Sequence, residues 1–385
     1  MQLQTARDKN RDRRFHMNPP PALNGPPPFY KLASKGCERQ RSPVTRRCTA
    51  PRRVAEVLLT CQTESVSFST MAGVAVPIVE LTGGVKFPMI GFGTWQSAPD
   101  VVGNAVRTAI DAGYRHIDCA WNYFNEKEVG QAIKDKIAEG KIKREDVFIT
   151  TKLWCTYHRP EDVKRGFQES LNDLGLDYID LFLIHGPPAF KPGPKWFPTD
   201  DSDFDDTDYV DTFKAMESLV DEGLCRAIGL SNFNTQQLER VLQNCRIKPA
   251  VNQVELHPYL VQQKLVDYCK SKNVVITAYS PLGSPGRDFA QPGEARVLED
   301  PVVLDIAKNH GKTPAQVLLR YHLDRGIVVI PKSVTPSRIK ENLQVLDFSL
   351  TADDIKTLGS LDRKNRYVDW SFCKTHKYFP FNDSA

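Results

Sequence analysis

The chain has 385 residues, of which 41% are hydrophobic and 25% charged, and its net charge is +4. This composition is that of a globular protein, and no apolar run approaches the roughly 20 residues of a membrane span. The charge is uneven, because residues 1–70 carry 13 Lys and Arg against 5 Asp and Glu, whereas residues 71–385 carry 38 against 42. The larger part is mildly acidic without a basic stripe, which argues against a nucleic acid or a membrane as partner.

Residues 1–70 form a basic, proline-rich extension, and residues 71–385 are predicted to form the folded part. The extension contains NPPPALNGPPPFY and no periodic segment of helix length, so we expect it to be disordered. A mitochondrial presequence is the alternative, but Asp8, Asp12 and the proline clusters oppose an amphipathic transit helix. Met71 stands directly before the first ordered pattern and is a second candidate for the start of the working protein.

From residue 76 onward, apolar runs of strand length alternate with segments of helical periodicity. Two runs flank Gly83-Gly84, which predicts an N-terminal β-hairpin. Eight further runs predict strands, and each is followed by a helical pattern. The predicted strands are 89–93, 115–120, 146–153, 178–185, 225–232, 250–256, 274–282 and 327–333. The predicted helices are 101–113, 126–140, 161–175, 208–223, 235–244, 261–272, 301–309, 314–324 and 335–343, the last with Thr335 as its N-cap.

This alternation predicts a (β/α)8 barrel of the TIM type. Strands that are apolar on both faces and are linked by helices form parallel sheets, and eight such units match the barrel. The rival is an open doubly wound sheet, which would bind a dinucleotide through G-x-G-x-x-G after its first strand. The candidate segment, GFGTWQ, lacks the third glycine. The sequence therefore favours the barrel.

Polar side chains gather where the predicted strands end, which is the edge that holds the active site in such barrels. Asp118 and Tyr123 follow the second strand, Lys152 closes the third and His185 closes the fourth. Each alone has an ordinary alternative as a capping, surface or packing residue. Their recurrence at one rim favours a shared site, which later strand ends join with Ser231, Asn232, Gln253, Tyr279, Ser280, Lys332 and Ser333.

The first four of these residues have the chemistry of a proton donor for a carbonyl oxygen. A tyrosine hydroxyl is a poor acid at neutral pH, but a neighbouring ammonium favours the phenolate and would lower the pKa of Tyr123. Asp118 would keep Lys152 charged, and His185 would hold the carbonyl oxygen by a hydrogen bond. No nucleophile with a base and no metal-ligand cluster joins them. Carbonyl reduction therefore fits the set better than hydrolysis, and it needs a hydride carrier.

The last strand–helix junction offers a place for that carrier. The segment IPKSVTPSRIKEN puts Lys332, Ser333 and Arg338 around a helix N-terminus, where backbone N–H groups favour an anion. Two cations at a helix end suit a phosphate monoester, such as the 2′-phosphate of NADP, better than a neutral ribose. The alternative to an anion site is that these charged residues form a solvent-exposed face without a ligand.

Three motifs, GYRHIDCAWNYFNEKEVG, LGLDYIDLFLIH and IPKSVTPSRIKEN, together resemble the aldo-keto reductases. The resemblance is closest to the aldose reductase and aldehyde reductase group, and it runs from about residue 76 to the C-terminal YFPF. It implies an NADPH-dependent barrel with a C-terminal specificity segment and with Asp118, Tyr123, Lys152 and His185 as catalytic tetrad, Tyr123 being the general acid. The implied cofactor residues are Thr94, Trp95, Asp118, Ser231, Asn232, Gln253, Tyr279, Ser280, Pro281, Leu282, Ser284, Lys332, Ser333, Val334, Thr335, Arg338, Glu341 and Asn342.

One position departs from the family pattern, in which a tryptophan that walls the substrate pocket follows the catalytic histidine. This chain has Gly186 there, followed by two prolines. Either a neighbour such as Phe197 or Trp370 fills the space, or the pocket is wider beside the histidine. The wider pocket is favoured because Gly-Pro-Pro restricts the backbone and limits collapse. The expected substrate residues are Trp95, Tyr123, Trp154, His185, Gly186, Phe197 and Trp370.

The nine cysteines are odd in number and never spaced as C-x-x-C, which fits free thiols in a reducing compartment. With the resemblance, this predicts a cytoplasmic, monomeric enzyme that reduces aldehydes, including sugar- or lipid-derived ones, and some ketones to alcohols. The alternative is an NADPH-binding barrel that serves a regulatory or structural role with little turnover.

Overall fold

An antiparallel sheet of three strands precedes the main fold. The computed structural model describes residues 67–71 and 74–382. Within it, β1 (Ser67–Met71) pairs with β2 (Val74–Leu81), and β2 pairs with β3 (Val85–Pro88). Because β1 begins at Ser67, the prediction of disorder up to residue 70 is wrong for the last residues of that segment, and residues 1–66 lie outside the described part.

The turn between β2 and β3 contains Gly83 and Gly84, whose φ angles of 90° and 77° suit glycine. The β3 strand then covers the amino ends of the barrel strands. The ring of Phe87 lies 4.7 Å from both the His116 ring and the Phe148 ring, measured between centroids. These two residues begin the second and third barrel strands, so the hairpin closes the barrel floor opposite the predicted site.

The main sheet has eight parallel strands, adjacent to one another in chain order. Its two edges meet, because the Gly91 N–H donates to the Val329 carbonyl at 2.8 Å and the Gly93 N–H to the Pro331 carbonyl at 3.0 Å. The strands are β4 (Phe92–Gly93), β5 (His116–Asp118), β6 (Phe148–Leu153), β7 (Ile179–Ile184), β10 (Cys225–Ser231), β11 (Val251–Glu255), β12 (Val275–Tyr279) and β13 (Val328–Val329).

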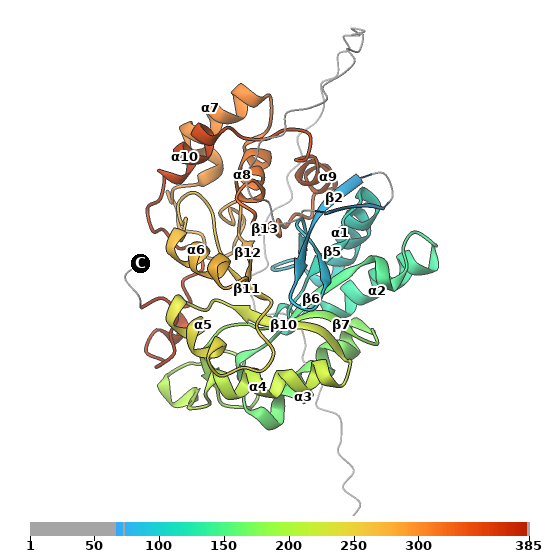
Figure 1. The fold of residues 1–385 in the computed structure, drawn as a ribbon, viewed down its shortest axis with the longest axis vertical. Helices are drawn as coiled ribbons and strands as arrows, with labels where there is room; N and C mark the ends of the chain where they lie inside the picture. The colour runs from blue at the N-terminus through green and yellow to red at the C-terminus, as the bar shows by residue number, and fades with distance from the viewer. Residues whose placement is uncertain (1–66, 72–73, 383–385) are drawn as a thin grey trace, which may run out of the picture. The chain divides into compact units, whose positions relative to one another are not determined.

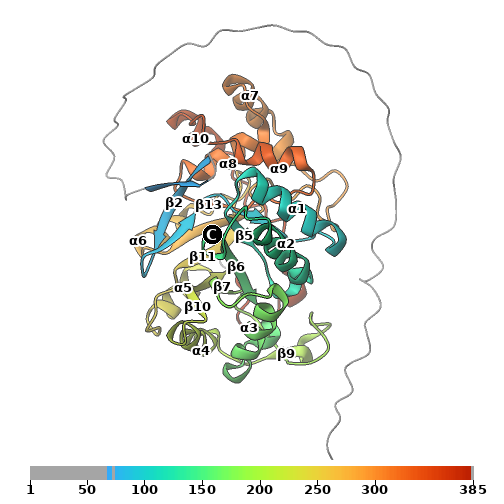
Figure 2. The same cartoon turned by 90° about the vertical axis from the view of Figure 1, so that its right-hand side faces the viewer.

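Helices surround this sheet (Figure 1). Turned by 90°, Figure 2 shows α1, α2 and α3 outside β5, β6 and β7. The alternation of strand and helix predicted from the sequence is confirmed. The helices are α1 (Pro99–Ala112), α2 (Glu126–Ala138), α3 (Pro160–Leu174), α4 (Tyr209–Asp221), α5 (Thr235–Leu242), α6 (Gln263–Ser271), α7 (Pro301–His310), α8 (Pro314–Leu323), α9 (Pro336–Leu343) and α10 (Ala352–Gly359).

Local sequence explains these elements. All six residues of β7 are buried, as expected for a strand covered on both faces. The α3 helix begins with Pro160 at its first turn, buries one apolar stripe and ends at Gly175, whose φ of 61° lies in the left-handed region. At α9, Thr335 occupies the N-cap position and a proline follows in the first turn, as predicted, although the Thr335 side chain makes no capping hydrogen bond among the described residues.

Two segments outside the barrel, a small strand pair and the C-terminal segment, lie at the carboxyl ends of the barrel strands. A small antiparallel pair, β8 (Ala189–Phe190) and β9 (Phe204–Asp205), lies in the loop after β7. After α10, the C-terminal segment returns to the barrel, where the N–H groups of Tyr367 and Val368 donate to the Glu255 carboxylate at the end of β11. Across the described ranges, the helices are too short or too polar to span a membrane.

Candidate active site

The four residues of the predicted tetrad meet at the carboxyl ends of adjacent strands. Asp118 ends β5, Lys152 lies near the end of β6, and His185 directly follows β7. Tyr123 ends the short 3-10 helix η1 (Trp121–Tyr123) just after β5. The order of β5, β6 and β7 in the sheet therefore brings residues from distant parts of the sequence together.

Lys152 lies at the centre of the tetrad. Its Nζ atom is 2.6 Å from Asp118 Oδ1, 2.8 Å from the Cys119 carbonyl and 3.3 Å from Tyr123 Oη. The second carboxylate oxygen of Asp118 accepts a hydrogen bond from Gln253 Nε2 at 2.7 Å. Because Lys152 is fully buried, these bonds fix the position of its side-chain nitrogen and offset the cost of burying it.

The phenol of Tyr123 differs from the sequence prediction. Burial, followed by the negative charge of Asp118, raises the pKa of Tyr123 well above its usual value of 10. In the protein alone the pKa of Tyr123 is therefore raised and not lowered as predicted, because burial disfavours the charged phenolate. An ammonium has no acceptor, so its bond to Oη directs the phenolic hydrogen away from Lys152. Tyr123 stands as a protonated donor beside the cavity.

His185 is neutral at physiological pH. Burial, together with the charge of Lys152 and the neighbouring His158, holds the pKa of His185 well below its usual range. Its carbonyl accepts from Asn232 Nδ2 at 2.9 Å, and its imidazole lies 5.7 Å from the Tyr123 ring, centroid to centroid. Within the described residues, Nδ1 of His185 has no hydrogen-bond partner. A neutral imidazole beside the phenol can hydrogen-bond a carbonyl oxygen without adding a charge.

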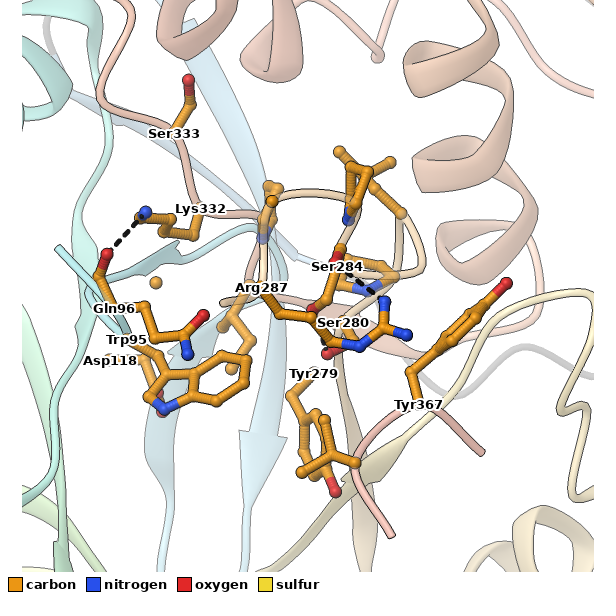
Figure 3. Close-up of a pocket in the computed structure, with 18 of the residues that line it drawn as sticks. Trp95, Gln96, Asp118, Tyr279, Ser280, Ser284, Arg287, Lys332, Ser333 and Tyr367 are labelled. Carbon is orange, nitrogen blue, oxygen red and sulfur yellow. Dashed lines mark hydrogen bonds between the residues drawn. The ribbon is translucent and has the colours of Figure 1, made fainter. Parts of the chain in front are cut away.

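A row of polar side chains continues from the tetrad along the strand ends. Tyr279 Oη donates to Asn232 Oδ1 at 2.7 Å, and Ser231 Oγ donates to the Gln253 carbonyl at 2.9 Å. The ring of Tyr279 faces the cavity opposite Trp95 (Figure 3). The row thus combines a flat aromatic surface with neighbouring amide and hydroxyl groups.

The amino end of α9 bounds the far side of the cavity. Arg338 lies on this helix, and Lys332 comes from the strand end that precedes it. Lys332 Nζ donates to the Gln96 carbonyl at 3.0 Å, which directs the lysine across the cavity mouth (Figure 3). The Ser333 hydroxyl accepts the Thr335 N–H at 3.1 Å. The predicted anion-binding groups therefore surround one opening.

One cavity of about 1360 Å³ joins the tetrad to this helix end. Thr94 does not line it, because this buried residue instead donates to the Asp118 carbonyl at 2.8 Å. The predicted cofactor residues that do line it are Trp95, Asp118, Ser231, Asn232, Gln253, Tyr279, Ser280, Pro281, Leu282, Ser284, Lys332, Ser333, Val334, Thr335, Arg338, Glu341 and Asn342.

The sequence interpretation included the start of the loop between β12 and α7, up to Ser284, but it missed the rest of that loop, which lines the same cavity. Arg287 forms an ion pair with Glu294, and its guanidinium lies 4.6 Å from the Tyr367 ring centroid. Phe289 lies 6.3 Å from Trp95, ring to ring. The available signal was the long stretch GSPGRDFAQPGEAR at a strand's carboxyl end, because long loops there tend to be functional.

The prediction of a wider pocket at Gly186 is wrong. A Cβ atom on Gly186 would lie 2.5 Å from Cζ3 of Trp370, so the indole fills the space that the glycine leaves. The prediction considered only the restricted backbone of Gly-Pro-Pro, whereas the space is filled by a side chain from the C-terminal segment. Gly186 does not line the cavity; the expected substrate residues that do are Trp95, Tyr123, Trp154, His185, Phe197 and Trp370.

Comparison with known proteins agrees with this fold. The sequence model described as "Aldo/keto reductase family" matches residues 89–363. Aldo-keto reductase family 1 member A1-A from Danio rerio is 50% identical over 317 residues, which cover 79% of this chain and 98% of that protein. Prostaglandin-E(2) 9-reductase from Oryctolagus cuniculus is 50% identical over 316 residues, covering 79% and 97%. The solved aldose reductase from Schistosoma japonicum matches with a TM-score of 0.75 and 45% identity, covering 80% of this chain and 99% of that one.

The fold and its relatives define an oxidoreductase of the TIM-barrel type that acts on carbonyl or alcohol groups. The chain belongs to the aldo/keto reductase family. Enzymes of this family generally use a nicotinamide cofactor and act on small carbonyl compounds.

Proposed function

We propose that this chain is a reductase that uses NADPH to convert aldehydes and some ketones to alcohols, with Tyr123 as the general acid. The hydrogen bond from Lys152 Nζ to Tyr123 Oη, at 3.3 Å beside the cavity, carries the proposal. The three similar proteins described above are named as reductases, which supports reduction as the working direction. Sugar-derived and lipid-derived aldehydes fall within the proposed class.

In this proposal, Tyr123 gives its phenolic proton to the carbonyl oxygen as that oxygen becomes an alkoxide. Burial keeps the phenol protonated beforehand, and an alkoxide is a strong enough base to take the proton. The ammonium of Lys152 then stabilises the phenolate that remains, while Asp118 keeps that ammonium in place. The three residues thus act as one proton-delivery unit.

His185 has a different role, because it is neutral and lies beside the phenol. Its imidazole would hydrogen-bond the carbonyl oxygen and hold that oxygen near Tyr123 Oη. Aromatic side chains surround this position: Trp154 lies 5.3 Å and Trp370 6.0 Å from the imidazole, centroid to centroid. These walls exclude water around the reacting oxygen.

The cavity fits a dinucleotide cofactor. Its 1360 Å³ exceeds the roughly 300–1,000 Å³ of pockets for drug-sized ligands, which leaves room for cofactor and substrate together. Tyr279 would stack on the nicotinamide, and Ser231, Asn232 and Gln253 would bind its carboxamide. When bound, the cofactor supplies the hydride.

The choice of NADPH over NADH depends on the opposite end of the cavity. The amino end of α9 presents backbone N–H groups, with Lys332 and Arg338 beside it. These groups favour the doubly charged 2′-phosphate, which NADH lacks.

The proposed enzyme acts as a monomer in the cytoplasm. All six cysteines in the described part of the chain are free thiols, which suits a reducing compartment. Size-exclusion chromatography with light scattering should give the mass of one chain, and the mass of two chains would contradict the monomer.

The direct test of the proposed function follows NADPH absorbance with an aromatic aldehyde as substrate. We expect aldehyde-dependent loss of the NADPH absorbance band and formation of the primary alcohol. NADPH binding without turnover across a panel of aldehydes and ketones would contradict it. That result would favour the alternative of a regulatory or structural barrel.

A further inference from the structure

Gly186 is needed for space and not for its backbone conformation. Its φ is outside the left-handed range in which glycine is favoured, so another residue could adopt the same backbone. A side chain, however, would meet the indole of Trp370: the Cβ position is 2.5 Å from Cζ3 and 3.3 Å from Cζ2. The absence of a side chain at residue 186 therefore allows the indole to approach.

The indole of Trp370 is held firmly beside the catalytic histidine. Trp370 is 6% exposed, and its ring lies 5.9 Å from the Trp154 ring and 5.5 Å from the Phe372 ring. Its backbone has φ 53° and ψ 31°, a left-handed conformation that is unfavourable for a bulky residue. Packing must offset that cost, so the position of this side chain is strongly determined.

The segment that carries Trp370 is anchored to the barrel just before the indole. The Glu255 carboxylate accepts the N–H groups of Tyr367 at 2.7 Å and Val368 at 2.9 Å, and it also pairs with His257 Nε2 at 2.9 Å. Glu255 ends β11 and is fully buried. The C-terminal segment therefore places the indole from a fixed point on the sheet.

We propose that Trp370 and Gly186 form a complementary pair that sets the size limit of the substrate pocket beside His185. The C-terminal segment supplies the aromatic wall, and the glycine leaves the volume that the indole occupies. This inference rests on the proposed reductase function. With this size limit, the pocket accepts slender or flat aldehydes and excludes aldehydes with bulky branches next to the carbonyl carbon.

The exclusion follows from where the carbonyl group must lie. Its oxygen has to reach Tyr123 Oη and the His185 imidazole, whose ring centroid is 6.0 Å from that of Trp370, so a substituent on the neighbouring carbon would meet the indole wall. A flat or unbranched substituent can extend along the cavity without meeting the indole. A branched substituent overlaps the indole, and the anchored segment resists displacement.

The experiment is a double-mutant cycle on the NADPH-bound enzyme, with propanal and diphenylacetaldehyde as the slender and bulky substrates. Trp370→Gly should raise the ratio of kcat/KM for the bulky over the slender aldehyde by about tenfold or more. The swapped variant Gly186→Trp/Trp370→Gly should return the ratio toward that of the wild type, because an indole again fills the same volume. Gly186→Trp alone brings two indoles together and should lower turnover of both substrates.

Control variants distinguish a failure of the proposed size limit from a failure of the proposed function. Leu304→Ala, on the exposed face of α7, should leave the ratio unchanged, and Trp370→Leu replaces Trp370→Gly if that variant does not fold. An unchanged ratio in a folded, active Trp370 variant overturns the pair as size limit and leaves the proposed function intact. No turnover of either aldehyde by the wild type overturns the proposed function, and this inference with it.

Discussion

The Nζ atom of Lys152 lies 2.6 Å from Oδ1 of Asp118, and the two side chains are 0% and 2% exposed. A charge in this position is costly unless it is paired, because the desolvation of each ion must be offset by its partner and by further hydrogen bonds. Gln253 and the Cys119 carbonyl provide those further bonds. The pair is therefore both a structural element and the support of the proposed proton donor.

Removing the charge of Asp118 should damage stability and activity together. Asp118→Asn leaves a buried ammonium without its counter-charge, and we expect the free energy of unfolding to fall by about 3 kcal/mol or more. Turnover should fall by about 10²-fold, because the phenol loses its positioned ammonium. Urea unfolding and NADPH oxidation measure the two effects.

The matched control is Asp135→Asn, which removes a carboxylate paired with Arg107 at the protein surface, where both side chains are partly exposed. Exposed ion pairs contribute little, so both stability and turnover should stay close to those of the wild type. Equal losses in Asp118→Asn and Asp135→Asn would contradict the special role of the buried pair.

The main sheet and its helices were predictable because burial on both faces and helical periodicity leave strong sequence patterns. β7 is apolar at every position except Asp180, and α3 has an apolar stripe between a proline and a glycine. The two-residue strands β8 and β9 carry no such pattern, and they were not predicted. β1 was missed because its sequence, SFSTM, has only a short alternation of apolar and polar residues.

The site residues that lie at the ends of strands could be predicted from the sequence. The contact between the C-terminal segment and the loop after β7 could not. Asp118, Lys152 and His185 could be placed because the ends of parallel strands share an edge. The approach of Trp370 to Gly186 depends on the path of the C-terminal segment, which no local pattern encodes. The shift of the Tyr123 pKa depends on burial, which the sequence interpretation did not weigh against the nearby ammonium.

Arg338 should discriminate between the two nicotinamide cofactors. Arg338→Ala removes a charge-assisted bond to the 2′-phosphate worth about 1.5–3 kcal/mol, so the Kd for NADPH should rise by about tenfold or more. The Kd for NADH should change little. Fluorescence titration with both cofactors measures this, with Lys340→Ala on the same helix as control. Equal weakening of NADPH and NADH would mean that Arg338 does not bind the 2′-phosphate.

Buried histidines should make the protein less stable in mild acid. Burial, followed by His376, lowers the pKa of His158 to about 3, while Asp205 acts in the opposite direction. Between the ordinary value of 6.5 and about 3, the unfolded chain binds more protons than the folded one, so stability falls as pH falls. At a pH of about 5, this one imidazole accounts for a loss of about 2 kcal/mol.

The measurement compares urea unfolding at pH values of about 7.5 and about 5. The wild type should lose stability between them, and His158→Gln, which cannot titrate, should lose less. If the variant and the wild type lose the same amount, His158 is not one of the groups responsible.

The central claim is that Tyr123 delivers the proton, and Tyr123→Phe tests it most directly because only the hydroxyl is removed. NADPH titration and steady-state reduction of an aromatic aldehyde should be measured on the same preparation. We expect the Kd for NADPH to stay near that of the wild type while kcat falls by about 10²-fold or more, the scale of general acid catalysis. Near-normal turnover with cofactor binding intact would contradict the assignment of the acid and of the site built around it.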